Sequence, residues 1–270
     1  MSRDTPGSTN HTAVPEGAAR FPTCASKAEL EANLADVQAR ITAAARRVDR
    51  DPAQIRLLPV TKTMGDEAVG WLAETGVGLV GENKAQEARG KRELFDDLGL
   101  SWAMIGHLQS NKVNQVAGYA VELQSLDRLS LAGKLDRRLQ TLGASIDVFI
   151  QVNSSGEASK YGLEPDDVPG FADEIRSLDT LRVRGLMTLA VFSQDRDLVV
   201  RCFTTMVDLR ERLRQDASDP ERFAELSMGM SGDFELAIEH GATTVRVGQA
   251  IFGARDLGPD YYWPTSVEPH

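Results

Sequence analysis

Short apolar runs alternate with helical patterns along most of this chain, and this alternation limits the possible folds more than any other feature. Each run ends at glycine or polar residues, a pattern typical of strands buried on both faces of a parallel sheet. Eight such runs occur: Ile55–Thr63, Gly78–Gly81, Trp102–Ile105, Ala120–Leu126, Ile146–Val152, Val183–Leu186, Leu226–Met228 and Thr243–Val247.

Helical patterns separate these runs, and strands that alternate with helices form parallel βαβ units. Eight units favour a closed (β/α)8 TIM barrel over an open doubly wound sheet, because no glycine-rich dinucleotide fingerprint follows the first run. We therefore predict the α/β class and a single domain. The predicted helices are Asp66–Thr75, Ala85–Leu98, Val113–Ala117, Arg128–Leu142, Pro165–Leu178, Asp195–Ala217 and Phe234–His240.

The barrel is predicted to span residues 26–258, between a disordered tail at residues 1–25 and a C-terminal tail at residues 259–270. The N-terminal tail is rich in small and polar residues and lacks apolar periodicity. Ser26 and Glu29 form a capping-box pattern, and the apolar spacing after them predicts a helix to about Val48. We expect this helix to plug or flank the barrel bottom, and we expect no second domain.

Composition argues against several classes of protein. The net charge of −10 and the lack of a basic cluster disfavour nucleic-acid binding. No apolar stretch is long enough to cross a membrane, and the N-terminus lacks a signal-peptide pattern. The two cysteines, Cys24 and Cys202, fit a reducing cytosol, so we expect a cytoplasmic protein. The four histidines lack metal-ligand spacing, and we predict no metal site.

Lys62 ends the first apolar run, where the active site of such a barrel lies. Apolar walls would lower the pKa of its amine, because burial disfavours the charged form. A neutral amine is a nucleophile that forms a Schiff base with an aldehyde. The alternative is a lysine that extends its head into water at a strand end.

The loops after the seventh and eighth runs resemble an anion site. Ser231 precedes a helix in a loop rich in small residues, and Gly248 begins a second glycine-flanked turn. Barrels of this type frequently bind phosphate at these two loops. An ordinary serine cap is the alternative reading of Ser231. Arg246 is predicted to point into the barrel, where an anionic or hydrogen-bond-accepting ligand, or a carboxylate on a neighbouring strand, would pair with it.

Motifs along the whole predicted barrel resemble the pyridoxal 5′-phosphate (PLP) homeostasis protein family, and their order and spacing support the match. The matching stretches are Leu57–Thr63, Gly81–Asn83, Ile105–Lys112, Ser125–Leu129, Gln151–Asn153, Ser159–Gly162, Arg184–Met187, Leu226–Ser231 and Val245–Arg255.

This resemblance implies the barrel of the alanine racemase N-terminal domain, with PLP as cofactor, held as a Schiff base on Lys62. It places Arg246 by the pyridine nitrogen and Asn83 close to the ring. The phosphate would lie at Ser227, Ser231, Gly248 and the adjoining backbone, which includes Met228. The chain departs from the family pattern at Thr61, His107 and Gln249, where serine, proline and a small hydroxyl residue are common.

The resemblance implies a PLP carrier in vitamin B6 and amino-acid homeostasis, without robust catalysis. Its partners would be PLP and PLP-dependent apo-enzymes, with no nucleic acid or membrane, and we expect a monomer. The alternative is a low-activity PLP-dependent amino-acid racemase, in which Tyr161 could serve as a second base. A third reading is a barrel that binds another phosphorylated ligand without a covalent link.

Overall fold

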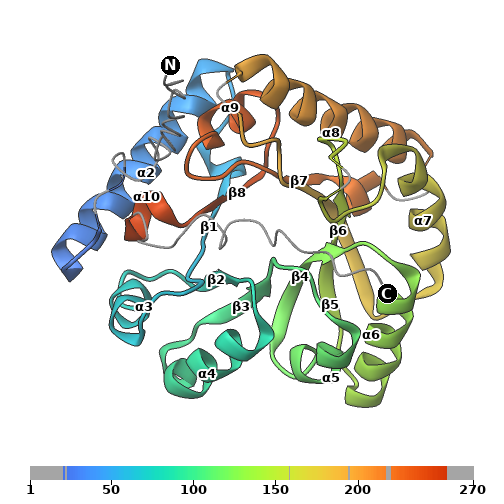
Figure 1. Ribbon diagram of the computed structural model, residues 1–270, viewed down its shortest axis with the longest axis horizontal. Coiled ribbons are helices and arrows are strands. Elements are labelled where there is room, and N and C mark those ends of the chain that lie inside the picture. Colours follow the sequence, from blue (N-terminus) through green and yellow to red (C-terminus); the bar gives the residue numbers. More distant parts are fainter. Residues whose placement is uncertain (1–20, 22, 158, 194, 217–219, 254–270) are drawn as a thin grey trace, which may run out of the picture.

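The computed structural model describes residues 21, 23–157, 159–193, 195–216 and 220–253. Eight strands form one sheet in the order β1-β8-β7-β6-β5-β4-β3-β2, and every neighbouring pair is parallel. The sheet curls into a nearly closed barrel, with helices on its outside (Figure 1). The predicted α/β class and single (β/α)8 barrel are therefore confirmed.

The strands agree closely with the predicted apolar runs. They are β1 (Arg56–Pro59), β2 (Leu79–Glu82), β3 (Ser101–Met104), β4 (Ala120–Leu126), β5 (Ile146–Val152), β6 (Leu181–Thr188), β7 (Glu225–Ser227) and β8 (Thr244–Val247). The helices are α2 (Lys27–Arg47), α3 (Asp66–Ala73), α4 (Ala85–Phe95), α5 (Val113–Val116), α6 (Leu129–Leu142), α7 (Val168–Glu174), α8 (Arg196–Asp216), α9 (Phe234–Glu239) and α10 (Gln249–Phe252).

The barrel closes between β1 and β2 through a short contact. Val60 forms an isolated parallel bridge with Gly81, and the Thr61 N–H donates to the Gly81 carbonyl at 3.0 Å. The first strand was predicted to continue to Thr63, but its ladder ends at Pro59. Thr63 has a φ of 60°, which lies in the left-handed region and is incompatible with a strand. Lys62 therefore lies in a turn at the seam of the barrel.

Helix α2 flanks the barrel along its outer side. The Ser26 hydroxyl accepts from the Glu29 N–H, as the predicted capping box requires, whereas the Glu29 carboxylate accepts from the N–H of Ala25 rather than from that of Ser26. Asn33 donates to the Ile251 carbonyl at 3.0 Å, and Arg40 bonds Glu235 of α9. These contacts fix α2 against α9 and α10 on the outside of the wall, as Figure 1 shows.

The folded part begins earlier than the predicted boundary at residue 26. Phe21 and Cys24 pack against the apolar core, and the Cys24 N–H donates to the Phe252 carbonyl at 3.1 Å. Two isolated apolar residues show no periodicity, so the sequence pattern gave no signal for these contacts. The remainder of the predicted tails, residues 1–20, 22 and 259–270, lies outside the described residues, as does the predicted end of the barrel at residue 258.

Two differently composed regions fill the fold. Apolar residues form a large cluster that includes Leu72 of α3, Leu131 of α6 and Phe203 of α8, together with strand residues that face the helices. Charged and polar side chains are instead buried inside the strands, including Glu122, Arg246 and others. Further buried polar or charged residues of the strands are Glu82, Gln124, Ser125, Gln151, Thr188, Ser227 and Thr244. The usual barrel interior consists of branched apolar side chains, so this polar content distinguishes the barrel.

Gly185 allows β6 and β7 to approach closely, and its replacement should destabilise the fold. A Cβ at this position would lie 1.8 Å from the Glu225 carbonyl oxygen. We expect Gly185→Ala to lower the free energy of unfolding by about 1–3 kcal/mol, the usual range for overpacking. Urea unfolding measures this change. Gly90→Ala is the matched control, because nothing lies within 4 Å of a Cβ there and helix α4 should gain slightly in stability. Equal stability of the two variants would contradict this account.

Candidate functional site

A buried ion pair between Lys91 and Glu82 supports the turn that carries Lys62. The Lys91 ammonium, from α4, donates to the Thr61 carbonyl and to Glu82 Oε1, both at 2.5 Å. The Thr61 hydroxyl donates to the same Glu82 oxygen at 2.6 Å. Thr61, Glu82 and Lys91 are all buried, whereas the Lys62 side chain is partly exposed at the barrel mouth. The backbone just before Lys62 is therefore fixed by charged hydrogen bonds.

The backbone just after Lys62 is strained. Thr63 is a β-branched residue at a φ of 60°, an uncommon conformation that the surroundings must enforce. The Thr63 N–H donates to the Glu87 carboxylate at 3.2 Å, which helps to hold it there. The Thr63 hydroxyl oxygen is buried and has no hydrogen-bond partner among the described residues. Strained residues with unsatisfied polar atoms are concentrated at binding sites.

Asn83 follows β2 beside this turn, and Gly106 packs directly on it. A Cβ on Gly106 would lie 2.3 Å from the Asn83 carbonyl oxygen and 2.8 Å from its Cα. The Ile105 N–H donates to the Glu82 carbonyl at 2.9 Å. The segment after β3 therefore holds the segment after β2 closely. Asn83 is partly exposed and follows the C-terminal end of β2, as Lys62 follows that of β1.

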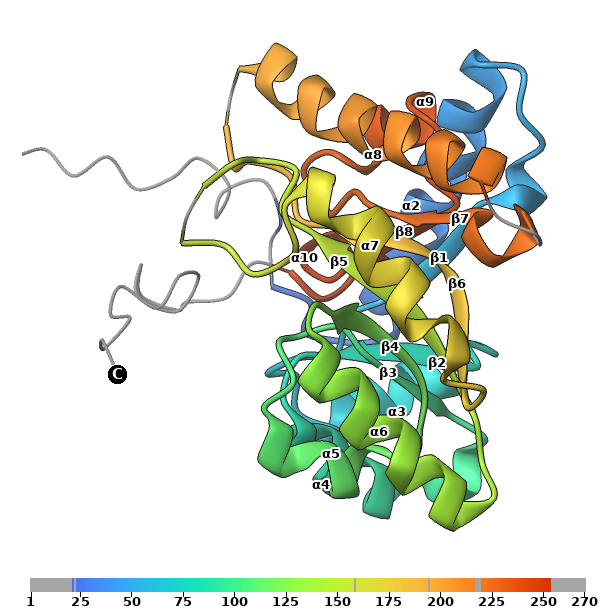
Figure 2. The same ribbon diagram turned by 90° about the vertical axis from the view of Figure 1, so that its right-hand side faces the viewer.

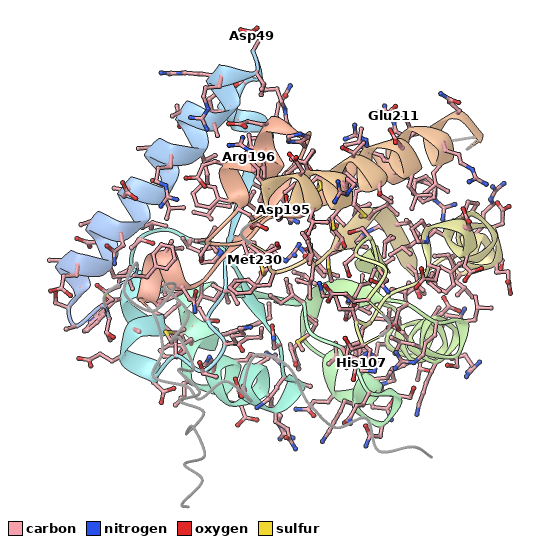
Figure 3. All side chains as sticks on the ribbon, turned by 45° about the horizontal axis from the view of Figure 1, so that its top comes forward. Asp49, His107, Asp195, Arg196, Glu211 and Met230 are labelled. Atoms are coloured by element: carbon pink, nitrogen blue, oxygen red, sulfur yellow. The ribbon has the colours of Figure 1, made fainter. Side chains whose placement is uncertain are left out.

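The loops after β7 and β8 meet and present backbone donors. The Ser231 hydroxyl accepts from the Ala250 N–H at 3.2 Å, which joins the two loops. The N–H groups of Ser231, Gly232 and Gly248 donate to no acceptor in the described part of the chain. Figure 3 labels Met230 in the loop after β7. Three such amides at a barrel mouth form a donor set that suits a phosphate.

Arg246 lies inside the barrel and is 3% exposed. Its Nη1 donates to Ser227 Oγ at 2.7 Å, and its Nη2 donates to the Thr188 carbonyl at 2.7 Å. Burial lowers the pKa of Arg246 to about 10, an effect partly opposed by the charges of Asp233 and Glu122. The guanidinium therefore remains cationic at neutral pH. Two of its five N–H groups are used by described residues, which leaves donors for a ligand.

His107 and Tyr161 stack across two loops of the mouth. Their ring centroids lie 4.0 Å apart at an interplanar angle of 18°. His107 follows β3, and Tyr161 belongs to the β5–α7 loop, which extends beyond the end of the barrel in Figure 2. His107 Nδ1 lies 3.4 Å from an Asp127 oxygen. Tyr161 is 53% exposed, so it remains largely open to solvent despite this stacking.

Three further residues at the ends of strands take part in contacts within the fold. Asn153 bonds Glu157 and Glu164, and Thr188 accepts an Arg246 bond through its carbonyl. The buried Met228 donates its N–H to the Thr244 carbonyl at 3.1 Å.

In the portion of the chain that the structure describes, no cluster of His, Cys, Asp or Glu could hold a metal ion. Likewise, no described helix is long and apolar enough to cross a membrane.

The residues present fit PLP at this mouth. Amide donors suit its phosphate, a cationic N–H donor suits its pyridine nitrogen, and a lysine on a fixed turn suits its aldehyde.

Lys91 and Glu82 support the turn that carries Lys62, but the sequence did not lead us to expect a role for Lys91. A signal was present, because Lys91 follows the buried Ala85 and Ala88 at successive spacings of three on the inner face of α4.

Comparisons with known proteins identify the family. Residues 32–256 match the family model described as alanine racemase, N-terminal domain. A pyridoxal phosphate homeostasis protein of Pseudomonas aeruginosa is 42% identical over 226 residues, which cover 84% of this chain and 96% of that protein. The protein of the same description from Escherichia coli K12 is 37% identical over 227 residues, covering 83% and 96%.

Solved structures extend the comparison. PipY of Synechococcus elongatus PCC7942, with PLP bound, is 31% identical with a TM-score of 0.70, covering 79% of this chain and 100% of that chain. An alanine racemase of Clostridium difficile shares the fold alone, at 15% identity and a TM-score of 0.69, over 86% of this chain and 58% of that chain. The fold, the mouth and these relatives agree, and the chain belongs to the pyridoxal phosphate homeostasis proteins, within the family of the alanine racemase N-terminal domain.

Proposed function

We propose that this protein binds PLP at the barrel mouth, with Lys62 as the Schiff-base residue, and acts in PLP homeostasis. The observation that carries the proposal is the fixed turn at the seam of the barrel. That turn presents Lys62 at the same end as the unpaired amides of Ser231, Gly232 and Gly248. PipY supports it as a relative with PLP bound.

Each proposed contact has a chemical reason. PLP, when bound, supplies an aldehyde that a lysine amine attacks. Lys62 would form that link, and Asn83 would contact the ring from the neighbouring segment. Ser231, Gly248 and the backbone near Met228 would hold the phosphate, and the buried Ser227 would contribute through its bond with Arg246. Arg246 would donate an N–H to the pyridine nitrogen.

The charge of Arg246 favours a carrier over a catalyst. A cationic donor at the pyridine nitrogen disfavours protonation of that nitrogen, and an unprotonated ring is a weaker electron sink. Tyr161, the candidate for a second base, stacks on His107 and is half exposed. Such a ring is poorly placed to hold a proton in a water-excluded site. Amino-acid racemisation by a second base is therefore disfavoured.

The proposal extends to the cellular role. We propose that the protein is a monomer in the cytoplasm and delivers PLP to apo-enzymes. Both cysteines are free thiols, which fits a reducing compartment. Lys62 is only partly buried, so a partner amine can reach the same position. Transfer of bound PLP to an apo-enzyme, followed by recovery of that enzyme's activity, tests this role directly.

Lys62→Ala should abolish covalent attachment of PLP and leave the barrel folded. Borohydride reduction followed by peptide mass spectrometry should locate the cofactor on Lys62 in the wild type and on no residue in the variant. Lys112→Ala is the matched control, since Lys112 lies in another loop of the mouth and should not affect attachment. A reducible adduct that persists at Lys112 or Lys160 in the Lys62 variant would overturn the assignment.

Ser231→Asp should weaken PLP binding strongly, because its carboxylate would face the phosphate dianion. Ser231→Ala should cost only about 1–3 kcal/mol, since the backbone donors remain. Equilibrium titration at fixed salt measures both changes. Ser130→Asp adds the same charge to the exposed first turn of α6 and should leave affinity unchanged. Wild-type affinity in Ser231→Asp would place the phosphate elsewhere.

The PLP-loaded protein should show negligible racemase turnover with alanine and other free amino acids. Loss of one positioned acid–base group typically lowers a rate by about 10²- to 10⁴-fold. Deuterium exchange at the α-carbon, combined with chiral analysis of the product, provides the measurement. Rapid exchange with inversion, lost in Tyr161→Phe, would favour the racemase reading instead.

A further inference from the structure

A chain of hydrogen bonds runs through the barrel interior from Arg246 to the opposite end of the strands. Arg246 Nη1 donates to Ser227 Oγ, and Ser227 Oγ donates to Gln124 Oε1, both at 2.7 Å. Gln124 Nε2 donates to Glu122 Oε1 at 2.6 Å. Arg56, the first residue of β1, donates to Glu122 at 2.7 Å and 3.2 Å. The chain therefore joins four strands, β1, β4, β7 and β8.

The donor and acceptor groups of these side chains fix the direction of every hydrogen bond in this chain of bonds. Glu122 is paired with Arg56 and, as a carboxylate, can only accept hydrogen bonds. The Gln124 amide must therefore turn its NH₂ toward Glu122 and its carbonyl toward Ser227. The Ser227 hydroxyl has one proton, and that proton goes to the carbonyl. Only lone pairs of the oxygen remain for Arg246, which can only donate.

This direction limits what Ser227 can do. A phosphate oxygen accepts hydrogen bonds, and the Ser227 proton is already committed to Gln124. Ser227 is also completely buried. Its hydroxyl is thus arranged to accept from Arg246, and this arrangement fits a support for Arg246 better than a phosphate contact. The second support is the Thr188 carbonyl on Nη2.

We propose that Gln124 and Glu122 are positioning residues that hold Arg246, through Ser227, in the orientation in which it meets the cofactor ring. The effect on the cofactor ring rests on the proposed function, in which PLP is the ligand. The hydrogen-bond chain itself does not depend on that ligand. Neither residue would touch the cofactor, because both act on Arg246 through Ser227. They act by fixing which atoms of Arg246 are used inside the barrel and which remain for the ring.

The first arm of the test uses the protein without PLP. In side-chain NMR with ¹⁵N-labelled arginine, a held guanidinium gives separate η-nitrogen signals, because rotation about its Cζ–Nε bond is slow. We expect separate signals for Arg246 in the wild type and averaged signals in Gln124→Met, which conserves volume and removes the acceptor of the Ser227 proton. Gln115→Met removes a comparable bond, to the Ala85 carbonyl, outside the barrel and should keep the signals separate.

Gln124→Glu should restore the separate signals. Its carboxyl group would lie against Glu122, and this like charge together with burial favours the protonated form. That form donates to Glu122 and accepts from Ser227, as the amide does. Glu122→Gln keeps the size of the side chain and should also average the Arg246 signals. It provides an independent test if Gln124→Met does not fold. Unchanged Arg246 signals in both folded Gln124→Met and folded Glu122→Gln would overturn the proposal.

The second arm uses the PLP-loaded protein with a ¹⁵N-labelled pyridine ring. In Gln124→Met we expect a shifted ring-nitrogen signal and about 3- to 10-fold weaker PLP retention, the effect of one lost hydrogen bond. An unshifted ring signal together with unaltered retention would overturn the link to the cofactor. If the wild type retained no PLP, the proposed function would fail, whereas the arginine signals would still decide the positioning role.

Discussion

The seam between β1 and β2 determines where Lys62 lies. These two strands meet through the Val60–Gly81 bridge and the bond from Thr61 to Gly81, rather than through an extended ladder. The side chains of Ile105 and Leu58 pack over Gly81, where a Cβ would lie 3.2 Å and 3.5 Å from them. The chain then turns sharply, with Thr63 in the left-handed region. A lysine at such a seam can reach the mouth because its backbone is fixed on both sides.

The charges buried in this barrel are better explained by a ligand than by stability. Replacing a buried ion pair by well-packed apolar residues often leaves stability unchanged or increases it, so such a pair is weak evidence of a stabilising role. The chain nevertheless buries Lys91 with Glu82 and links Arg246 to Glu122. The first pair supports the turn of the proposed Schiff-base lysine. The second system supports the proposed partner of the pyridine nitrogen.

The alternation of apolar runs was sufficient to predict the barrel. The placement of Lys62, Asn83 and Arg246 around one cofactor stays a prediction. Other features depend on contacts between strands distant in sequence. The two-residue spacing of Glu122 and Gln124 predicts that both lie on one face of β4. It does not predict that Gln124 meets Ser227 of β7, as it does in the structure. The stacking of Tyr161 on His107 likewise depends on how two loops meet. The φ of Thr63 has no sequence signal, because threonine rarely adopts it.

The direction of the internal chain suggests a division of labour within the proposed cofactor site. The Ser227 hydroxyl is committed to Gln124 and Arg246, so the phosphate would depend on the Ser231 loop and the neutral amides around it. Arg246, buried and cationic, would serve the ring and leave the phosphate to these amides. Neutral amides form weaker hydrogen bonds to an anion than charged donors do. A site that holds its phosphate with amides and its aldehyde with a reversible link is suited to releasing the cofactor as well as binding it.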